Sequence, residues 1–565
     1  MLIKICAVNS KFIHSNPAVH SLARYYYQLC SQANLEHTDI KIHEYTVNDV
    51  YKNVLLSIIS DNPDVIGFSV YIWNFDFISR LCADIKKISP QTKIILGGPE
   101  VSFGVSLDEN IYDYIIIGEG ERAFFCLINE LLGVDVGYYK DSFGYRIDDG
   151  VKVSCDRIEN LSEIPFIYGY DESDKDKTNI NLFRSRIIYY ESSRGCPFSC
   201  SYCLSANENE GSGVRYLPLE RVYNDLDFFI KEETVEQVKF VDRTFNSNKN
   251  RAYSIIKYII DNTKHNKKNI NFHFEICADL LDDKIINLLG EAELGLIQLE
   301  VGIQTTNEKI LELCARKTDI NKCLGNIALL LKNKNINMHV DLIAGLPGET
   351  FESFKDSFNQ VYFLFAHQFQ FGFLKLLKGA PLNNQVKQYG YKFSDRPPYE
   401  ILGNADMTHE DLAVLSRIEI VTDKFYNSQK FTASLNYLIE CDNYFETPFD
   451  FYLQLSSYLL QRNLLYHPLS LANLYGVLID FAFAAVNSKI DIACLKEMLL
   501  MDYHSGDMYD KPPASIRDTW VPYKNYKADA INQAANLTAR KIGQRFYYFD
   551  YSKKNPITNQ YDYRQ

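Results

Sequence analysis

The 565-residue sequence lacks the features that would tie it to a membrane or to export. Its amino terminus, MLIKICAVNS, has no basic segment followed by an apolar core and a cleavage site, so we expect no signal peptide. The best candidate for a membrane span, residues 463–479, is too short and contains His467 and Pro468, and we expect a buried helix pair there. These absences predict a cytoplasmic protein with no membrane span.

An excess of positive charge is also missing. The formal net charge is −13, which disfavours non-specific binding of nucleic acid. The end of the chain differs, because residues 524–556 combine lysine and arginine with tyrosine. Proteins that bind single-stranded RNA use this mixture of cations and stacking rings. An amphipathic docking helix followed by a solvated strand explains the same residues more simply.

The length predicts several domains rather than one core. Residues 1–140 alternate apolar runs with helical patterns near 17–33, 49–60, 75–88 and 120–132, and the runs lie at 2–8, 40–46, 64–71, 93–98 and 113–118. Strands that are apolar throughout and alternate with helices are typical of a doubly wound parallel sheet, where ligands bind at the carboxyl ends of the strands. We therefore predict an α/β fold with a Rossmann-like binding domain over residues 1–140.

The rest of the chain divides into three further parts. Residues 141–183, which include a hairpin at 143–154, predict a linker. A second series of strands, at 187–190, 238–242, 270–276, 296–302, 336–343 and 369–377, predicts a partial (β/α)6 barrel over residues 184–384. Residues 385–565 carry leucine, tyrosine and phenylalanine at helical spacing and lack convincing strands, which predicts a mostly α-helical C-terminal domain.

The most informative motif lacks a fourth cysteine. SRGCPFSCSYC, residues 193–203, places Cys196, Cys200 and Cys203 in a C-x3-C-x2-C loop. A closed zinc site would need a fourth ligand from elsewhere, such as Cys277 or His273. Three thiolates can instead hold three irons of a 4Fe–4S cluster and leave the fourth iron open. The spacing favours the cluster over zinc.

This loop resembles the signature of the radical S-adenosylmethionine (SAM) superfamily. The resemblance implies that the three cysteines ligate the cluster, that the open iron binds SAM, and that Tyr202 lies beside the adenine. Reduction of the cluster would then cleave SAM to methionine and a 5′-deoxyadenosyl radical. Segments that resemble the superfamily's strand ends are VDRTFN, FEICADLL, LEVGIQT and LIAGLPGET, and they imply SAM contacts for Asp242, Glu275, Glu300 and Gln304.

The N-terminal segment resembles the cobalamin-binding class of the same superfamily. Its loops SVYIWN, LGGPE and GEGE imply cobalamin contacts at the strand ends by Ser69, Trp73, Gly97, Gly98, Glu100, Gly118, Glu119 and Gly120. The D-x-H-x-x-G motif, whose histidine replaces the cofactor's own base, is absent from the sequence, and His14 and His20 do not match it. Cobalamin is therefore expected to bind base-off without a histidine ligand.

The resemblance implies a cobalamin-dependent radical SAM enzyme, in the first place a methyltransferase acting on an unactivated carbon. Its substrate is a small molecule, a peptide or a tRNA, and its low-potential electron donor is a protein such as flavodoxin or ferredoxin. A tRNA-modifying enzyme, a rearrangement or cyclisation without methyl transfer, and a noncatalytic cobalamin and iron–sulfur sensor are the alternatives. The sequence does not identify a catalytic residue.

Overall fold

The computed structural model describes residues 1–104, 108–169, 184–209, 213–264, 268–441, 444–485, 490–507, 511–518, 520 and 538–565. The chain forms two compact units. The first comprises Met1–Glu275, Lys375–Gln388 and Lys392–Ile401, and the second comprises Ile276–Leu374, Tyr389–Tyr391 and Leu402–Gln565.

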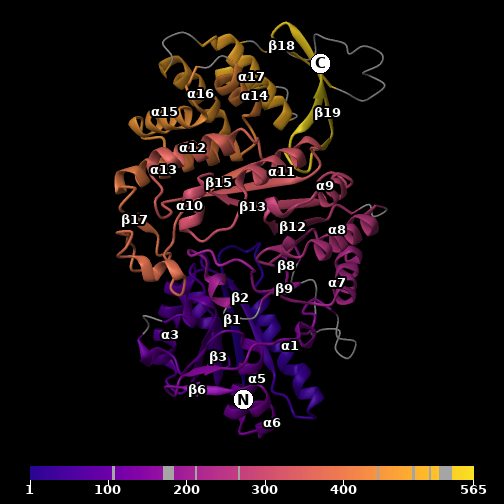
Figure 1. Ribbon diagram of the computed structural model, residues 1–565, viewed down its shortest axis with the longest axis vertical. Coiled ribbons are helices and arrows are strands. Elements are labelled where there is room, and N and C mark those ends of the chain that lie inside the picture. Colours follow the sequence, from indigo (N-terminus) through magenta and orange to yellow (C-terminus); the bar gives the residue numbers. More distant parts are fainter. Residues whose placement is uncertain are drawn as a thin grey trace. The chain divides into compact units, whose positions relative to one another are not determined.

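A parallel sheet forms the N-terminal part of the first unit, coloured indigo to purple in Figure 1. Its strands β1 (Ile3–Asn9), β2 (Ile40–Thr46), β3 (Val65–Ser69), β4 (Lys93–Gly97) and β5 (Tyr114–Ile116) pair in the order β2-β1-β3-β4-β5. The connecting helices are α1 (Pro17–Gln32), α2 (Tyr51–Ile59), α3 (Phe75–Ile88) and α5 (Gly120–Leu132). The predicted doubly wound α/β fold is confirmed.

Burial on both faces explains why these strands are apolar throughout. Ile5 of β1 packs in one core with residues of α1 and α5. The next residue, Cys6, packs in the opposite core with residues of α2 and α3. A polar side chain on this strand must therefore find a protein partner, as Lys4 does by donating to the Ser57 carbonyl at 3.1 Å and Asn9 does by donating to the Glu44 carboxylate at 2.7 Å.

A hairpin extends this sheet beyond the predicted domain boundary. Strand β7 (Lys152–Ser154) pairs in parallel with β5, and β6 (Arg146–Asp148) pairs antiparallel with β7. The amide of Ile115 donates to the carbonyl of Val151 at 2.8 Å, and Val153 is fully buried in the core. The hairpin that we placed in a linker therefore belongs to the sheet. Part of that linker, residues 170–183, lies outside the described residues.

Six further parallel strands alternate with helices along the chain. In the first unit, β8 (Ile188–Tyr190), β11 (Gln237–Phe240) and β12 (Asn271–Ile276) pair in that order. In the second unit, β13 (Ile297–Gln304), β14 (Asn337–Ala344) and β15 (Gln368–Phe373) do the same. The helices between them are α7 (Leu219–Lys231), α8 (Lys249–Thr263), α9 (Asp283–Gly290), α11 (Ile320–Lys332) and α12 (Phe351–Tyr362). All six strands lie where the sequence predicts them.

Helices dominate the C-terminal part of the second unit, drawn in orange and gold in Figure 1. They include α13 (His409–Thr422), α15 (Pro448–Gln461), α16 (Leu471–Ala485) and α17 (Ile492–Gly506). The helix pair predicted over 463–479 is wrong, because helix begins only at Leu471. Among the described residues, none of the helices combines the length and apolar character that crossing a membrane requires.

The chain ends in a three-stranded antiparallel sheet, where the sequence predicted at most one solvated strand. It consists of β18 (Thr538–Ile542), β19 (Arg545–Lys554) and β20 (Tyr561–Arg564). Gly543, with a φ of +58°, makes the tight turn between β18 and β19. The expectation that residues 385–565 lack strands is therefore wrong for this segment, and residues 521–537 lie outside the described part of the chain.

Candidate cofactor sites

The cysteine loop follows β8 and the short strand β9 (Ser193–Arg194) in the first unit. Gly195 has a φ of +98°, a left-handed backbone conformation that favours glycine, and it turns the chain into Cys196. Cys196 and Cys200 are buried and Cys203 is half-buried, and all three are present as thiols rather than disulfides. The Cys203 amide donates to the Cys200 carbonyl at 3.0 Å, so a turn joins the last two cysteines.

The donor set of this loop fits an iron–sulfur cluster. Soft thiolates are the ligands that such clusters take, and three of them leave one iron for another ligand. The Cys196 sulfur lies 3.6 Å from the Thr244 hydroxyl, which comes from the turn after β11. A hydroxyl beside a ligating sulfur can tune the reduction potential of the cluster through hydrogen bonding.

Asp242 lies where its carboxylate holds the start of this loop. It accepts hydrogen bonds from the Ser192 amide at 2.8 Å, the Ser192 hydroxyl at 2.6 Å and the Ser193 amide at 3.1 Å. The side chain is buried, and burial raises the pKa of Asp242 although these hydrogen bonds oppose the shift. The geometry gives Asp242 a structural task at the entry to the loop, and its predicted contact with SAM stays a prediction.

The other two site residues predicted in this unit occupy different surroundings. Tyr202 is half-buried within the cysteine loop itself. Glu275 lies at the end of β12, where Lys239 of β11 approaches its carboxylate to 3.3 Å. Sequence reasoning missed Lys239, although its alternation with the buried Val238 and Phe240 places it on the half-buried face of β11.

In the second unit, Glu300 lies on a half-buried polar face of β13. The side chains of β13 alternate strictly between buried and half-buried, as the sequence predicts. On β14, His339 pairs in register with Glu300, and Asp341 pairs with Gly302. One ligand atom from each of Glu300, His339 and Asp341 lies within 4.8 Å of the others, and His339 Nε2 is 3.0 Å from the Asp341 carboxylate. This face offers hydrogen-bond acceptors to a polar ligand.

Sequence reasoning did not name His339 or Asp341. The signal that could have found them is the two-residue alternation of NMHVDLI, which puts both side chains on the same face of β14. Parallel pairing with β13 then brings them beside Glu300.

Gln304 lies at a bulge at the end of β13. Its φ is +71°, and the pairing with β14 shifts between Gly302 and Gln304. A Cβ at Gly302 would lie 2.1 Å from Gln304 Nε2, so the Gln304 amide packs against the face of Gly302 that carries no side chain. Gln304 Oε1 is buried with no hydrogen-bond partner among the described residues. Such a buried acceptor suits a ligand hydroxyl, which fits the predicted contact with SAM.

Glu349 was not predicted as a special residue, although it belongs to the GLPGET turn. Its side chain is fully buried in the second unit. Burial raises the pKa of Glu349 to about 8, with the Thr305 hydroxyl and nearby backbone amides opposing the shift. Burial therefore favours the uncharged form of this carboxyl in the native protein.

Replacing Glu349 with glutamine is expected to stabilise the protein at high pH. Between the ordinary pKa of 4.5 and about 8, the unfolded state releases a proton that the native state retains, so the free energy of unfolding falls as pH rises through this window. A shift of that size corresponds to at most about 5 kcal/mol above pH 8. Glutamine has no charge to bury and should remove this loss.

Denaturant unfolding at pH 5.5 and 8.5 measures the effect. The Glu349→Gln protein should gain stability over the wild type at the higher pH and much less at the lower pH. The exposed neighbour Glu352 provides the control, since Glu352→Gln should change stability little at either pH. An equal change at both pH values would contradict the buried, protonated carboxyl.

A pocket in the first unit opens at the carboxyl ends of β3, β4 and β5. Its lining is rich in glycine and small or apolar side chains, including Ser69, Gly97, Gly98, Gly118, Gly120 and Phe124. Gly98 has a φ of +113°, and a Cβ there would lie 2.6 Å from the Val70 carbonyl oxygen. Glycine at this position thus lets the loop after β4 pack on the backbone of Val70. At Gly118 a Cβ would meet nothing within 4 Å, so the backbone there is open to a ligand. Open backbone of this kind suits the amide or phosphate groups of a large ligand, which fits cobalamin.

Five of the eight predicted cobalamin residues line this pocket, and Trp73, Glu100 and Glu119 are not among its lining residues. Trp73 is 47% exposed and stacks on Tyr71, which does line the pocket, at 4.4 Å between ring centroids. The buried Glu100 accepts a hydrogen bond from the Tyr399 hydroxyl, and burial raises the pKa of Glu100. Glu119 forms an ion pair with Arg215. Cofactor contact by these residues stays a prediction.

The two histidines near β1 have protein partners. His14 Nδ1 lies 2.6 Å from the Tyr189 hydroxyl, and His20 Nε2 lies 2.9 Å from the Glu44 carboxylate. Burial lowers the pKa of His14, with Lys11 and Lys239 adding to the shift.

Three family models match successive parts of the chain. Residues 3–127 match the B12 binding domain, residues 190–361 match the radical SAM superfamily, and residues 387–561 match a protein family of unknown function, DUF4080.

Two curated proteins and one solved structure illustrate the similarity. The chain is 27% identical over 356 residues to the cobalamin-dependent radical SAM methyltransferase TokK of Streptomyces tokunonensis, covering 58% of this chain and 50% of TokK. It is 26% identical to the uncharacterized methyltransferase PH0819 of Pyrococcus horikoshii, covering 57% of this chain and 69% of that protein. The structure of the cobalamin-dependent SAM radical enzyme OxsB with aqua-cobalamin aligns with a TM-score of 0.59 and 14% identity, covering 89% of this chain and 79% of OxsB.

These matches show that the chain carries a B12 binding domain followed by a radical SAM domain, and the proteins similar to it include cobalamin-dependent radical SAM enzymes. The chain also carries a C-terminal region of the DUF4080 family. A 4Fe–4S cluster, SAM and cobalamin are the cofactors of these domains. The chain spans about half the length of TokK, so the substrate and the full reaction are inferred separately.

Proposed function

We propose that this protein is a cobalamin-dependent radical SAM methyltransferase that acts on an unactivated carbon. The observation that carries the proposal is the presence, in one compact unit, of a loop with three thiols and a glycine-lined pocket at the strand ends of a B12 binding domain. Three thiolates would hold a 4Fe–4S cluster and leave one iron open for SAM. The cluster, SAM and cobalamin supply radical and methyl-transfer chemistry, and the protein binds, orients and shields them.

Individual residues have distinct parts in this proposal. Cys196, Cys200 and Cys203 hold the cluster, and Tyr202 lies beside the adenine of SAM. Glu300 and Gln304 present acceptors to SAM hydroxyl or amine groups from the polar face of β13. Ser69 and the pocket glycines let cobalamin approach the backbone. The substrate class is a small molecule, a peptide or a tRNA.

The proposed partners follow from the chemistry. A reductant is required to cleave SAM, and a low-potential carrier such as flavodoxin or ferredoxin would supply the electron. The cysteines whose side chains the structure describes are thiols, which supports a reducing compartment such as the cytoplasm.

The test is a product analysis under anaerobic conditions. Protein reconstituted with iron, sulfide and hydroxocobalamin is incubated with SAM, a strong reductant and candidate substrates, and 5′-deoxyadenosine, S-adenosylhomocysteine and retained cobalamin are quantified together. We expect deoxyadenosine and S-adenosylhomocysteine in comparable amounts. Deoxyadenosine without S-adenosylhomocysteine would contradict methyl transfer and indicate rearrangement or cyclisation. Neither product would indicate a noncatalytic sensor.

A further inference from the structure

Two arginines lie side by side next to the cysteine loop. Arg194 of β9 and Arg215 of β10 (Arg215–Tyr216) are direct partners in an antiparallel pair. Arg194 comes two residues before Cys196. Their side chains are only 15% and 12% exposed, so water cannot screen the repulsion between the two guanidinium groups effectively. Nearby carboxylates are therefore needed to hold both arginines in place.

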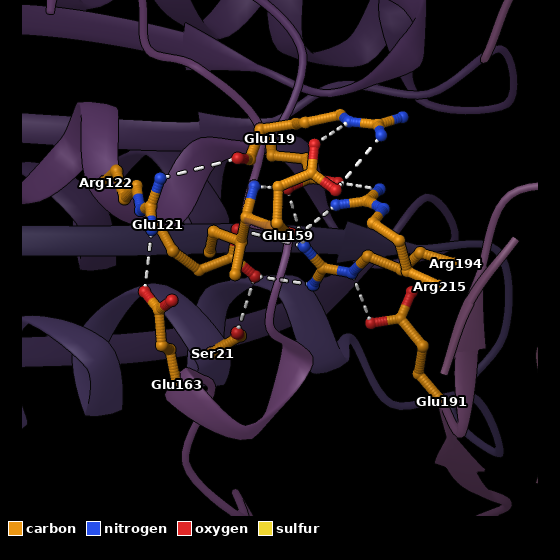
Figure 2. A network of polar contacts seen from close by, with 11 residues as sticks. Ser21, Glu119, Glu121, Arg122, Glu159, Glu163, Glu191, Arg194 and Arg215 are labelled. Atoms are coloured by element: carbon orange, nitrogen blue, oxygen red, sulfur yellow. Dashed lines mark hydrogen bonds and ion pairs between the residues drawn. The ribbon is translucent and has the colours of Figure 1, made fainter. Parts of the chain in front are cut away.

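The turn between β5 and α5 supplies these carboxylates. Arg194 donates to the Glu121 carboxylate at 2.7 Å and lies 3.5 Å from Glu119, and Arg215 donates to the other oxygen of Glu119. Glu191, just before β9, adds a third carboxylate at 2.8 Å from Arg194. Figure 2 shows the side chains of Arg194 and Arg215 pointing toward Glu119 and Glu121. The guanidinium groups thus bind a turn that is distant in sequence.

Glu121 also belongs to the ligand pocket of the N-terminal sheet. It lines that pocket together with Gly118 and Gly120, and it is 5% exposed. Its carboxylate accepts a hydrogen bond from Ser21 of α1 at 3.0 Å, and other residues of α1 line the same pocket. The Glu121 carboxylate therefore lines the pocket and also binds Arg194, which leads into the cysteine loop.

The backbone just before Arg194 is held in place, so a shift of Arg194 can pass only toward the cysteine loop. On its other side, Ser192 and Ser193 are fixed by Asp242, and the Arg251 guanidinium donates to the Ser192 carbonyl at 3.2 Å. A displacement of Glu121 by a ligand must therefore be taken up at Arg194, Gly195 and Cys196. Buried charge pairs of this kind fix orientation, because a guanidinium loses its partners if it moves.

We infer that Arg194 and Glu121 are positioning residues that couple the cobalamin pocket to the cysteine loop. A cobalamin bound in the pocket fixes the β5–α5 turn, the turn fixes Arg194, and Arg194 orders the backbone that presents Cys196 to the cluster. Coupling of this kind is reciprocal, so a cluster in the loop must tighten cobalamin binding by the same factor. This inference goes beyond methyl transfer, since it holds for any reaction that uses both cofactors.

The test compares cobalamin affinity with and without the cluster. Hydroxocobalamin is titrated into the full-length protein before and after reconstitution with iron and sulfide, and iron per chain is measured in each sample. For the wild type we expect binding to be about tenfold tighter with the cluster, within the roughly 5- to 150-fold range of such couplings. Arg194→Lys keeps the charge but loses the pair of N–H groups that Arg194 donates to the Glu121 carboxylate. In this variant, the cobalamin affinities with and without the cluster should become equal.

The control is Arg122→Lys, because Arg122 follows Glu121 directly in helix α5. Arg122 also makes a partly buried ion pair, with Glu163 at 2.7 Å, and Figure 2 draws Glu163 on the far side of the network from Arg194 and Arg215. This variant should retain the wild-type ratio of affinities. A wild-type ratio of one, or a full ratio in Arg194→Lys, would overturn the inference.

A second measurement guards against poor folding of one variant. Hydrogen exchange of residues 192–203 is followed in protein without cluster, with and without hydroxocobalamin. Exchange should slow on cobalamin binding in the wild type and in Arg122→Lys, and should not respond in Glu121→Gln. A response in Glu121→Gln equal to that of the wild type would contradict the coupling. Coupling without S-adenosylhomocysteine formation would remove the proposed function and leave this inference in place.

Discussion

Replacing any one of Cys196, Cys200 and Cys203 with alanine is expected to abolish SAM cleavage and to remove the visible absorbance of the iron–sulfur cluster. Each thiol is one of three ligands in a single loop, and two ligands do not hold a 4Fe–4S cluster with an open iron. Cobalamin should still bind, because its pocket is formed by the strand ends of the N-terminal sheet.

The measurement combines iron content, the visible spectrum and 5′-deoxyadenosine after reconstitution. Cys82→Ala is a suitable control, since Cys82 is a buried thiol of α3 in an apolar core. It should lose some stability but retain iron and SAM cleavage. Wild-type iron and deoxyadenosine in Cys200→Ala would rule out the cluster assignment.

The second large effect is expected at Asp242, where alanine and asparagine should differ. Alanine leaves the Ser192 amide, the Ser192 hydroxyl and the Ser193 amide without their acceptor in a buried site. At about 1–3 kcal/mol for each of the three unsatisfied groups, the free energy of unfolding should fall by roughly 3–9 kcal/mol. The cysteine loop should then fail to hold a full complement of iron.

Asparagine can keep all three contacts. Its carbonyl oxygen accepts from the two amides, and its NH2 group can donate to the Ser192 hydroxyl. Asp242→Asn should therefore load iron and bind SAM nearly as well as the wild type. A direct contact between Asp242 and the SAM amine would instead make Asp242→Asn load iron normally and lose SAM affinity. Iron analysis and SAM binding on both variants separate the two roles.

The sequence predicts the parallel sheets well because burial on both faces leaves long apolar runs. Every residue of β1 and β3 is buried, and in β1 only Lys4 and Asn9 depart from the apolar pattern. The terminal sheet could not be predicted in the same way. Its strand β19 is mostly aromatic and charged and has only one buried residue, Phe549, so neither an apolar run nor a clean alternation marks it. The turn at Gly543 was the available signal.

The residues of the candidate site likewise divide into those that local sequence marks and those that only the fold brings together. The cysteine loop and the pocket glycines could be identified because local spacing carries their chemistry. The roles of Asp242, Glu119 and Glu121 depend on partners that are distant in sequence, such as Ser192 and Arg194, and a single sequence does not show these pairs. His339 and Asp341 were missed because the register of β14 on β13 creates their proximity to Glu300.

The hairpin β6–β7 has a consequence for how the N-terminal domain can exist on its own. The hairpin covers the outer edge of β5, and the amides of Ile115 and Ile117 donate to it at 2.8 and 2.9 Å. A fragment cut at residue 140 would leave this edge open, and an open apolar edge strand recruits strands from other molecules. A proteolytic or engineered fragment that stays dispersed in solution must therefore extend at least past Ile158, which packs in the same core as β5.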